Sequence, residues 1–365
     1  MEASVAVVHD YLTQRGGAER VVLSMLKAFP GAPVYTSLYY PEGTFEEFRE
    51  IEIRRSFLDR AVPLRRRHRL ALPLLASAFS RMRVDAEVAV CSSSGWAHGA
   101  RVRGRKVVYC HTPARWLYQT DRYLGEHGGA ARLAVGTLRG RLRKWDQKAA
   151  ATADRYLANS TIVRERIRAV YAIDAELLPP PPALDPAGPV RAVDSIQDGF
   201  FLCVSRLLPY KNVDAVVAAF ARLPSERLVV VGAGPERERL RRDAPANVTF
   251  AGTVDDDQLR WLYGRCAGIV AASYEDFGLT PLEGAAFGKP SVALRWGGFE
   301  DTVTEGETGI LFEKPEPTSI ADAVRVCLRE NWSVQTLERH AAAFAERRFV
   351  ERLRAIVASV AGDGQ

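Results

Sequence analysis

Residues 200–234 read FFLCVSRLLPYKNVDAVVAAFARLPSERLVVVGAG. Two short apolar runs in this stretch, Phe200–Ser205 and Arg227–Gly232, flank an amphipathic segment at Val213–Leu223. This spacing predicts two parallel strands joined by a crossover helix. Because short β-branched runs alternate with amphipathic segments throughout the 365 residues, the sequence predicts an α/β fold with parallel sheets covered by helices on both faces.

A run of four prolines divides this pattern into two halves. Residues 178–183 read LPPPPA, which suits neither a helix nor a central strand and therefore predicts a stiff, extended connector. We expect two doubly wound, Rossmann-like domains facing each other across a cleft, the first over residues 1–182 and the second over residues 183–342. A single last helix is expected over Val334–Ala361, and we expect its end, residues 343–365, to join the first domain.

The composition narrows the class of protein. Apolar residues make up 47% and charged residues 26%, which is typical of a globular chain and excludes a disordered or fibrous one. A net charge of +6, from 50 basic and 44 acidic residues, is compatible with an anionic substrate, a membrane surface or nucleic acid. The five cysteines form no CxxC pair, which argues against a zinc site or a disulfide framework.

No stretch approaches the ~18 unbroken apolar residues that a membrane-spanning helix needs. The N-terminal residues MEASVAVVHDYL contain no basic leader, so no signal peptide is expected. We therefore expect a cytoplasmic protein, either free or attached peripherally to the inner face of the plasma membrane.

Ligands of open parallel sheets bind beyond the carboxyl ends of the strands, so the loops that leave strands are where chemistry is expected. In the first half, Gly16 and Gly17 precede a helix, where backbone N–H groups could approach an anion. A tight strand–helix turn explains these glycines equally well. His111 follows the strand Lys106–Cys110, where it could contact a sugar hydroxyl or be satisfied locally.

Two cations leave the strand Phe200–Ser205 in the second half. Arg206 and Lys211 lie in one strand-to-helix turn, and Asn212 is expected to cap the helix that follows. Two fixed cations beside a helix N-terminus could clamp a diphosphate. The alternative is that both are solvated surface charges, which is the commoner fate of lysine and arginine.

Residues 273–283, SYEDFGLTPLE, carry the densest group of candidate site residues. Glu275 lies in the loop after a predicted strand, and Glu283 lies in the first turn of the next helix. Thr280 as N-cap with Glu283 at the third helical position forms a capping box, which explains Glu283 without a ligand. Glu283 could also reach a ribose. The backbone at the helix start is expected to face a bound anion, and its residues are Phe277, Gly278, Leu279 and Thr280.

Two further strand exits in the second half end in glycine turns. One of them continues into Val254, which could pack against the face of a nucleobase. The other reads GGFE over residues 297–300. As structure alone, neither turn needs a ligand.

The E-x7-E pattern of Glu275 and Glu283, with Phe277-Gly278-Leu279 inside it, strongly resembles the retaining GT-B glycosyltransferases of family 4. The Gly16-Gly17 loop, His111 and the Arg206–Lys211 pair fall in the order that this family uses. The resemblance covers nearly the whole chain. Residues 9–22, HDYLTQRGGAERVV, and residues 110–118, CHTPARWLY, resemble bacterial mannosyltransferases that build polysaccharides and glycolipids.

The resemblance implies roles for the second-half residues. Arg206 and Lys211 would bind the diphosphate of a nucleotide-sugar. Glu283 would hydrogen-bond its ribose, and Glu275 would bind hydroxyls of the transferred sugar. The nucleotide-sugar would be GDP- or UDP-linked, with GDP-mannose the leading guess, and no cofactor is expected.

In the first half the resemblance implies that Gly16 and Gly17 let the backbone touch the phosphate and that His111 lines the sugar pocket. Two positions depart from the common pattern: Asp276 stands where many members have glycine, and Ala114 stands where relatives often carry methionine. We expect Asp276 to change little and Ala114 to alter the acceptor side.

The sequence contains no carboxylate pair that would clearly flank a glycosidic bond as nucleophile and acid. The family is thought to use front-face attack, in which the leaving diphosphate accepts the proton of the acceptor hydroxyl. We therefore expect His111, Glu275, Arg206 and Lys211 to act by positioning and electrostatics. No metal-ligand set is visible in the sequence, so turnover without a metal is expected.

The acceptor, a glycan, a lipid-linked sugar or a small molecule, is harder to predict. Arg54-Arg55 and the run RRRHR at residues 65–69 precede the apolar stretch 70–75. This combination could rest on an anionic membrane, cover a helix with solvated charges or hold a phosphorylated acceptor.

Three other functions stay open at this point. A nucleotide-sugar epimerase or a phosphorylase-like enzyme could use the same two-domain fold. A non-catalytic binder of nucleic acid or another polyanion is disfavoured, because acids balance the basic residues and no aromatic–basic motif is present.

Overall fold

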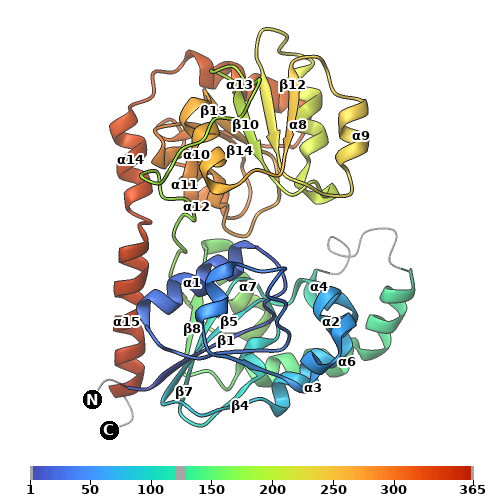
Figure 1. The fold of residues 1–365 in the computed structure, drawn as a ribbon, viewed down its shortest axis with the longest axis vertical. Coiled ribbons are helices and arrows are strands. Elements are labelled where there is room, and N and C mark those ends of the chain that lie inside the picture. The colour runs from blue at the N-terminus through green and yellow to red at the C-terminus, as the bar shows by residue number, and fades with distance from the viewer. Residues whose placement is uncertain (1–2, 120–128, 363–365) are drawn as a thin grey trace. The chain divides into compact units, whose positions relative to one another are not determined.

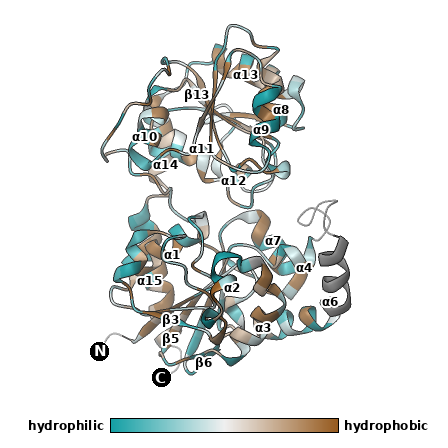
Figure 2. Cartoon of the chain, turned by 45° about the vertical axis from the view of Figure 1, so that its right-hand side comes forward, coloured by the Kyte–Doolittle hydropathy of each residue, from teal (hydrophilic) through white to brown (hydrophobic). Residues whose placement is uncertain are grey.

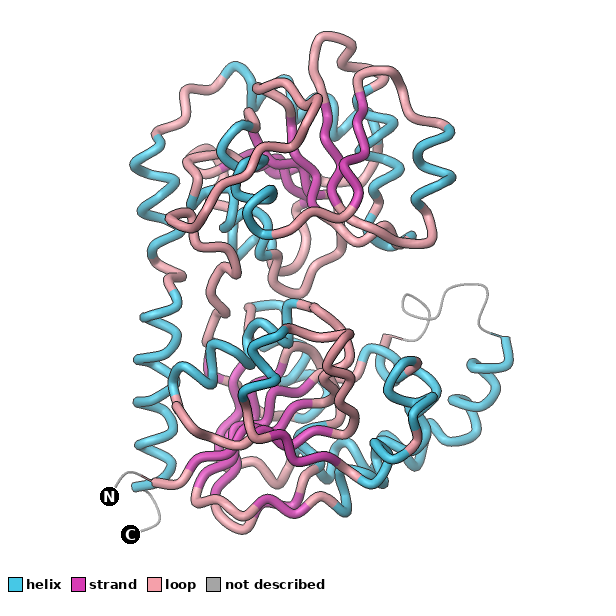
Figure 3. Tube along the Cα trace, in the orientation of Figure 1, coloured by secondary structure: helices cyan, strands magenta, loops and turns pink. Residues whose placement is uncertain are grey.

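The computed structural model describes residues 3–119 and 129–362 of the chain. These residues form two compact units. Unit 1 extends to Pro180 and resumes at Glu346, and unit 2 runs from Pro181 to Ala345. Figure 3 shows that each unit contains its own group of strands surrounded by helices.

Unit 1 is built on a seven-stranded sheet in which every neighbouring pair is parallel. The strand order is β3-β2-β1-β5-β7-β8-β9, and β4 and β6 form a separate parallel pair. The strands are β1 (Val5–His9), β2 (Val34–Thr36), β3 (Ile53–Arg55), β4 (Arg83–Val84), β5 (Val88–Ser93), β6 (Arg101–Val102), β7 (Arg105–Cys110), β8 (Arg155–Ala158) and β9 (Glu176–Leu177).

Helices cover both faces of this sheet (Figure 1). Its α-helices are α1 (Gly17–Ala28), α2 (Val62–Arg66), α3 (Leu72–Arg81), α4 (Arg115–Tyr118), α6 (Gly129–Ala150), α7 (Thr161–Tyr171) and α15 (Glu346–Gly362). Short 3-10 turns are η1 (Glu46–Glu50), η2 (Phe57–Arg60), η3 (His68–Ala71) and η4 (Ala97–Gly99). One apolar cluster joins alternate strand residues to α1 and α15, and a second joins the other strand face to α3 and α7. The period-2 alternation of strand side chains produces this division.

Unit 2 contains a six-stranded parallel sheet in the order β12-β11-β10-β13-β14-β15. Its strands are β10 (Phe201–Val204), β11 (Leu228–Val231), β12 (Val248–Gly252), β13 (Gly268–Ala271), β14 (Ser291–Leu294) and β15 (Gly309–Phe312). Its helices are η5 (Pro209–Lys211), α8 (Val213–Phe220), α9 (Arg237–Arg242), α10 (Asp256–Arg265), α11 (Leu279–Ala286), α12 (Phe299–Thr302), α13 (Pro317–Arg329) and α14 (Val334–Ala342).

Each sheet has a point where the winding direction reverses. In unit 1, β1 lies between β2 and β5, and in unit 2, β10 lies between β11 and β13. The crossovers on the two sides of such a point pack on opposite faces of the sheet, which leaves a crevice beyond the strand ends where ligands bind. The two parallel, doubly wound sheets confirm the predicted α/β class.

The C-terminal helix differs from the prediction of one element over Val334–Ala361. The chain instead forms α14 and α15, separated by Ala343–Ala345. The helix α15 lies along α1 (Figure 1), and Glu346 accepts hydrogen bonds from Ser24 Oγ and Lys27 Nζ at 2.7 Å each. The apolar period continues across both helices, so the sequence alone gives no sign of the break.

Candidate active site

Two chain segments meet at the reversal point of unit 2. The loop after β10 carries Lys211, and the loop after β13 carries Glu275. Lys211 is only 8% exposed, and its Nζ donates a hydrogen bond to Glu275 Oε1, which also accepts from Ser273 Oγ at 3.0 Å. A buried ammonium needs a partner, because leaving it desolvated and unpaired is costly. Glu275 therefore fixes Lys211 at the carboxyl edge of the sheet.

Tyr210 lies between the two predicted cations. The exposed Arg206 donates from Nη2 to the Tyr210 hydroxyl at 3.2 Å, and Lys211 Nζ lies 5.1 Å from the centre of the Tyr210 ring. The structure thus brings Arg206 and Lys211 together on one aromatic side chain. Sequence reasoning missed Tyr210 because nothing in the motif assigns it a polar role.

Asn212 does not cap α8 with its side chain, contrary to the prediction. It stands at the N-cap position in a left-handed conformation, with φ of 52°, and makes no side-chain cap. Its Nδ2 instead donates to the carbonyl of Ala272 at 2.8 Å. Asn212 therefore ties the exit of β10 to the exit of β13, the two loops that carry Lys211 and Glu275.

The predicted capping box at Thr280 and Glu283 is also wrong. The helix α11 begins at Leu279, and its N-cap is Gly278, which has φ of 83° and no side chain with which to cap. Thr280 is therefore already inside the helix. The left-handed turn at Gly278 starts the helix two residues earlier than a threonine cap would, and the backbone amides of its first turn receive no side-chain cap.

Glu283 is buried and points inward from α11. Its Oε2 accepts a hydrogen bond of 2.7 Å from the hydroxyl of Tyr263 on α10. Burial, followed by the nearby Glu283 carboxylate, raises the pKa of Tyr263 well above its ordinary value, so the hydroxyl stays protonated and keeps donating. Tyr263 was another residue that the sequence did not reveal.

The other residues that the sequence singled out in unit 2 pack in its core or shape its loops. The ring of Phe277 is buried and lies 6.1 Å from the ring of Phe344. A side chain at Gly298 would overlap the backbone of Phe277, so the GGFE turn lies directly against the loop that carries Glu275. Val254 is half-buried and packs against the apolar cluster beside α10.

In unit 1, Asp10 organises the loop that follows β5. Its carboxylate accepts backbone hydrogen bonds from Ser94 at 2.7 Å and Ala97 at 2.6 Å, with a longer one from Trp96 at 3.3 Å. Burial raises the pKa of Asp10, while His9 and these amides act in the opposite direction. Asp10 therefore bridges the ends of β1 and β5 at the reversal point.

The Gly16-Gly17 pair opens α1, with Gly16 as N-cap and no side-chain cap. A Cβ at Gly16 would lie 2.6 Å from Glu19 Oε2, so a side chain here would require the Glu19 carboxylate to shift. This close approach accounts for Gly16 without a ligand. Gly17 is exposed.

His111 lies at the end of β7, half-buried, with its ring 5.2 Å from and edge-on to Tyr109. Its Nε2 is 2.8 Å from Ser92 Oγ, which is also 3.0 Å from His9 Nδ1. The position at a strand end that singled out His111 would also have singled out His9, Asp10 and Ser92.

Among residues 3–119 and 129–362, no three His, Cys, Asp or Glu side chains are grouped to hold a metal ion. Within the same residues, no helix is long and apolar enough to cross a bilayer.

Four of the seven large apolar side chains that are exposed in the described part of the chain lie close together in sequence. They are Phe57 (43%), Val62 (53%), Leu70 (58%) and Leu74 (47%). The exposed arginines of the same stretch are Arg54, Arg55, Arg60, Arg66 and Arg67, while the side chain of Arg69 lies outside the described part. Figure 2 shows that α3 is largely hydrophobic, whereas α2, with the sequence VPLRR, carries both apolar and basic residues. We call this set the basic–apolar patch.

Two family models match the chain. Glycosyltransferase Family 4 matches residues 15–181, and Glycosyl transferases group 1 matches residues 194–347. The chain is 28% identical over 172 residues to O-antigen chain mannosyltransferase C of Escherichia coli, and this match spans less than half of either protein, 44% of each. It is 26% identical over 365 residues to human alpha-1,3/1,6-mannosyltransferase ALG2, covering 86% of this chain and 85% of that one.

The fold is similar to that of Anabaena HepE, solved in complex with UDP and glucose. The TM-score is 0.69 at 16% identity, and the match covers 98% of this chain and 100% of that chain. This likeness confirms the predicted GT-B fold class.

Proposed function

Because the chain belongs to the group 1 and family 4 glycosyltransferases, we propose that it moves a hexose, best assigned as mannose, from a nucleotide diphosphate sugar to an acceptor hydroxyl with retention of configuration. The mannose assignment is supported by the two mannosyltransferases that the chain resembles. GDP-mannose is therefore the proposed sugar donor, and a glycan, lipid-linked sugar or small alcohol is the proposed acceptor.

The observation that carries this proposal is the ion pair between buried Lys211 and half-buried Glu275 at the reversal point of unit 2. A diphosphate presents negative charge that a fixed ammonium and a guanidinium can hold by charge-assisted hydrogen bonds. Arg206 and Lys211 would supply these groups, and the N-terminus of α11 would add its dipole. Glu275 would turn to the hydroxyls of the transferred sugar, and Glu283, oriented by Tyr263, would bind the ribose.

The proposed reaction is front-face attack without a metal. The bond between the anomeric carbon and the diphosphate oxygen breaks as the acceptor oxygen bonds to the same face, and the leaving diphosphate takes the acceptor proton. Arg206 and Lys211 would stabilise the charge that develops on the leaving group, which is the part of the reaction where fixed cations lower the barrier most. His111 would line the sugar pocket in unit 1.

Lys211→Ala tests the proposal most directly. A charge-assisted hydrogen bond contributes about 1.5–3 kcal/mol, so kcat/KM for GDP-mannose should fall roughly 10- to 150-fold. Arg222→Ala, which removes an exposed arginine in the loop after α8, is the matched control and should leave transfer unchanged. Unchanged transfer by Lys211→Ala, or turnover of the nucleotide-sugar with no sugar appearing on any acceptor, would refute the proposal.

We also propose that the basic–apolar patch rests on an anionic bilayer. Exposed leucines beside arginines suit a surface with negative head groups over an apolar interior. Vesicles of phosphatidylglycerol should pellet the protein at low salt, whereas phosphatidylcholine vesicles should not. The double variant Leu70→Ser/Leu74→Ser should lose this binding, and Leu328→Ser, which alters an equally exposed leucine in unit 2, should keep it. If both variants pelleted equally with phosphatidylglycerol vesicles, the basic–apolar patch would not be the membrane-binding surface.

A further inference from the structure

An arginine in unit 2 leaves its hydrogen-bond donors unused. Arg237, the first residue of α9, is half-buried, and its Nε is enclosed without a hydrogen-bond partner in the described part of the chain. Its terminal nitrogens are accessible, and no hydrogen bond or ion pair joins them to another of residues 3–119 and 129–362. The preceding acid, Glu236, is engaged by Arg239, whose Nη2 lies 2.6 Å from Glu236 Oε2. The guanidinium of Arg237 is therefore available to a ligand.

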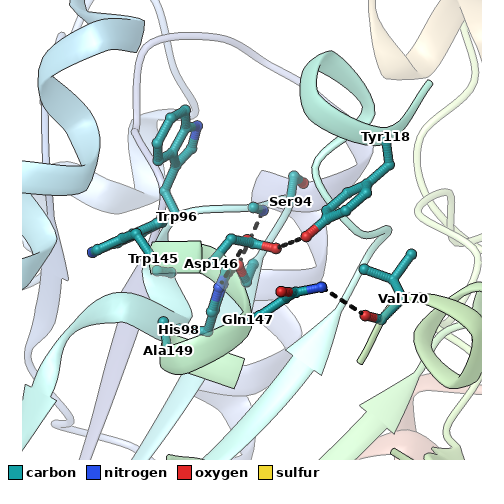
Figure 4. Close-up of polar contacts among 12 residues, drawn as sticks. Ser94, Trp96, His98, Tyr118, Trp145, Asp146, Gln147, Ala149 and Val170 are labelled. Carbon is teal, nitrogen blue, oxygen red and sulfur yellow. Dashed lines mark hydrogen bonds and ion pairs between the residues drawn. The ribbon is translucent and has the colours of Figure 1, made fainter. Parts of the chain in front are cut away.

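Two other buried polar groups show what a partner supplies. Figure 4 shows Asp146 of α6, whose Oδ2 accepts a hydrogen bond of 2.7 Å from the hydroxyl of Tyr118. In unit 2, Arg260 donates from Nη1 to Asp257 Oδ1 at 2.8 Å. An enclosed donor without a partner costs free energy that such hydrogen bonds recover. Arg237 would be completed by acceptors that the chain itself does not supply.

Arg237 lies beside a glycine turn with open space around it. Gly252 ends β12 with φ of 71°, and among the described residues a Cβ there would meet only Arg237 within 4 Å, at 3.6 Å from Nη2. The backbone N–H of Gly232 donates to the Gly252 carbonyl at 2.7 Å, which ties the exit of β11 to the exit of β12. Val254, the residue expected to pack against a nucleobase, follows two positions after Gly252. The guanidinium and this apolar side chain therefore belong to neighbouring strand exits.

Strand order relates these exits to the proposed diphosphate site. The exit of β10 carries Lys211, and β11 and β12 follow β10 in the sheet. Neighbouring strands are about 4.8 Å apart, so the exits of β10 and β12 are separated by about 10 Å. A nucleoside separates its diphosphate from its base by a comparable length. A nucleotide whose diphosphate lies at Lys211 can therefore bring its base to Arg237.

The donor pattern of a guanidinium selects one kind of base. Its terminal N–H groups lie in one plane and suit two acceptors that are side by side. Guanine presents such a pair, O6 and N7, on one edge. Adenine places an amino donor beside its N7, and a pyrimidine such as uracil offers one oxygen, O4, on the corresponding edge. An unpaired arginine at this position therefore favours guanine.

We propose that Arg237 recognises the nucleobase of the sugar donor, donating hydrogen bonds to O6 and N7 of guanine while Val254 packs against the face of the ring. This inference rests on the proposed function for the presence of a nucleotide, and it assigns the guanine base to a particular side chain. Arg237 would determine specificity and take no part in the reaction itself. Its loss should therefore raise the KM for GDP-mannose and leave kcat nearly unchanged.

Isothermal titration with GDP and 7-deaza-GDP, which carries a C–H group in place of N7, tests the contact without turnover. The unmodified protein should bind GDP roughly 10- to 150-fold more tightly, the equivalent of one charge-assisted hydrogen bond. Arg237→Ala should bind the two ligands with nearly equal affinity. Arg237→Lys keeps the charge but loses the planar pair of donors, so it should recover only part of the difference. IDP lacks only the 2-amino group of GDP, so the ratio of GDP to IDP affinity should be the same with and without Arg237.

Two controls separate base recognition from a structural or general electrostatic role. Arg241→Ala removes an exposed arginine from the same helix and should keep the preference for GDP over 7-deaza-GDP. The affinity of Arg237→Ala for UDP should change little. A damaged fold, or the loss of a general attraction to phosphate, would instead weaken UDP and GDP alike.

The outcomes separate this inference from the proposed function. Equal affinity of the unmodified protein for GDP and 7-deaza-GDP, or a preference that survives Arg237→Ala, would overturn the base contact. If Arg237→Ala does not fold, the same comparison in Arg237→Lys decides. A protein whose preference for GDP depends on Arg237 but which transfers no sugar would leave the base contact established and refute only the glycosyl transfer.

Discussion

Replacing Tyr263 with phenylalanine isolates what holds Glu283 in place. The substitution removes one oxygen, whose hydrogen bond to Glu283 Oε2 is 2.7 Å long and buried, and it keeps the ring that stacks on Phe287 at 5.4 Å. A hydrogen bond to a charged group contributes about 1.5–3 kcal/mol. For a unit of this size, each kcal/mol lowers the melting temperature by roughly 2–4 °C, so Tyr263→Phe should melt roughly 3–12 °C lower.

On the proposed ribose contact of Glu283, the same variant should also bind nucleotide diphosphates more weakly, because the carboxylate loses the hydrogen bond that orients it. Differential scanning calorimetry gives the stability, and isothermal titration with GDP and UDP gives the affinity. Tyr39→Phe is the control: its hydroxyl donates to the carbonyl of Phe48 at 3.2 Å in unit 1, so it should cost less stability and leave nucleotide affinity unchanged. Unchanged melting in Tyr263→Phe would refute the energetic argument, and lower stability with undiminished affinity would separate Glu283 from ribose binding.

Three other perturbations test separate features. Gly278→Ala should destabilise the protein by about 1–3 kcal/mol in urea titrations. The alanine would have to adopt φ of 83°, and its Cβ would lie 2.5 Å from the ring of Phe299. Gly306→Ala is the control and should cost less stability, because Gly306 has a similar φ of 78° but open space around it. Burial raises the pKa values of the Cys203 and Cys266 thiols to about 12. Both thiols should therefore stay protonated and should not react with a thiol reagent from about pH 6 to 10 until the protein unfolds. Rapid labelling of these cysteines in the native protein would contradict this prediction. Chelation with EDTA should leave sugar transfer unchanged, and activity lost to EDTA and restored by magnesium or manganese would overturn the metal-independent mechanism.

The fold class was predictable because strand and helix periods are local properties of the sequence. The β-branched runs at Phe200–Ser205 and Arg227–Gly232 became β10 and β11 with nearly the predicted limits. The edge strand Ile53–Arg55 was not predicted, because two of its three residues are exposed arginines and no apolar alternation marks it. The sequence analysis also did not predict the break between α14 and α15, because the break occurs in an alanine-rich stretch and alanine favours helix.

Site residues could be proposed from the sequence, but their contacts could not. Position after a strand marked Lys211 and Glu275, and the structure brings the two side chains together at the reversal point of unit 2. Their mutual ion pair depends on strand order, since β10 and β13 are neighbours in space and not in sequence. The wrong prediction at Thr280 shows that a local motif can also mislead. The motif favoured a threonine cap, but the left-handed Gly278 is the N-cap and the helix begins at Leu279, before Thr280.

The two reversal points use the same backbone geometry for different chemistry. Unit 2 places a buried ammonium and a carboxylate there, and unit 1 places two histidines and a serine, with the carboxylate of Glu19 withdrawn beneath Gly16. Charged side chains suit a diphosphate, because their attraction to its negative charge offsets the hydration that they lose on binding. A sugar offers neutral hydroxyls, which carboxylates as well as uncharged side chains can bind by hydrogen bonds. The chemical contrast between the two sheet edges therefore lies in an ion pair in unit 2 and serine–histidine contacts in unit 1.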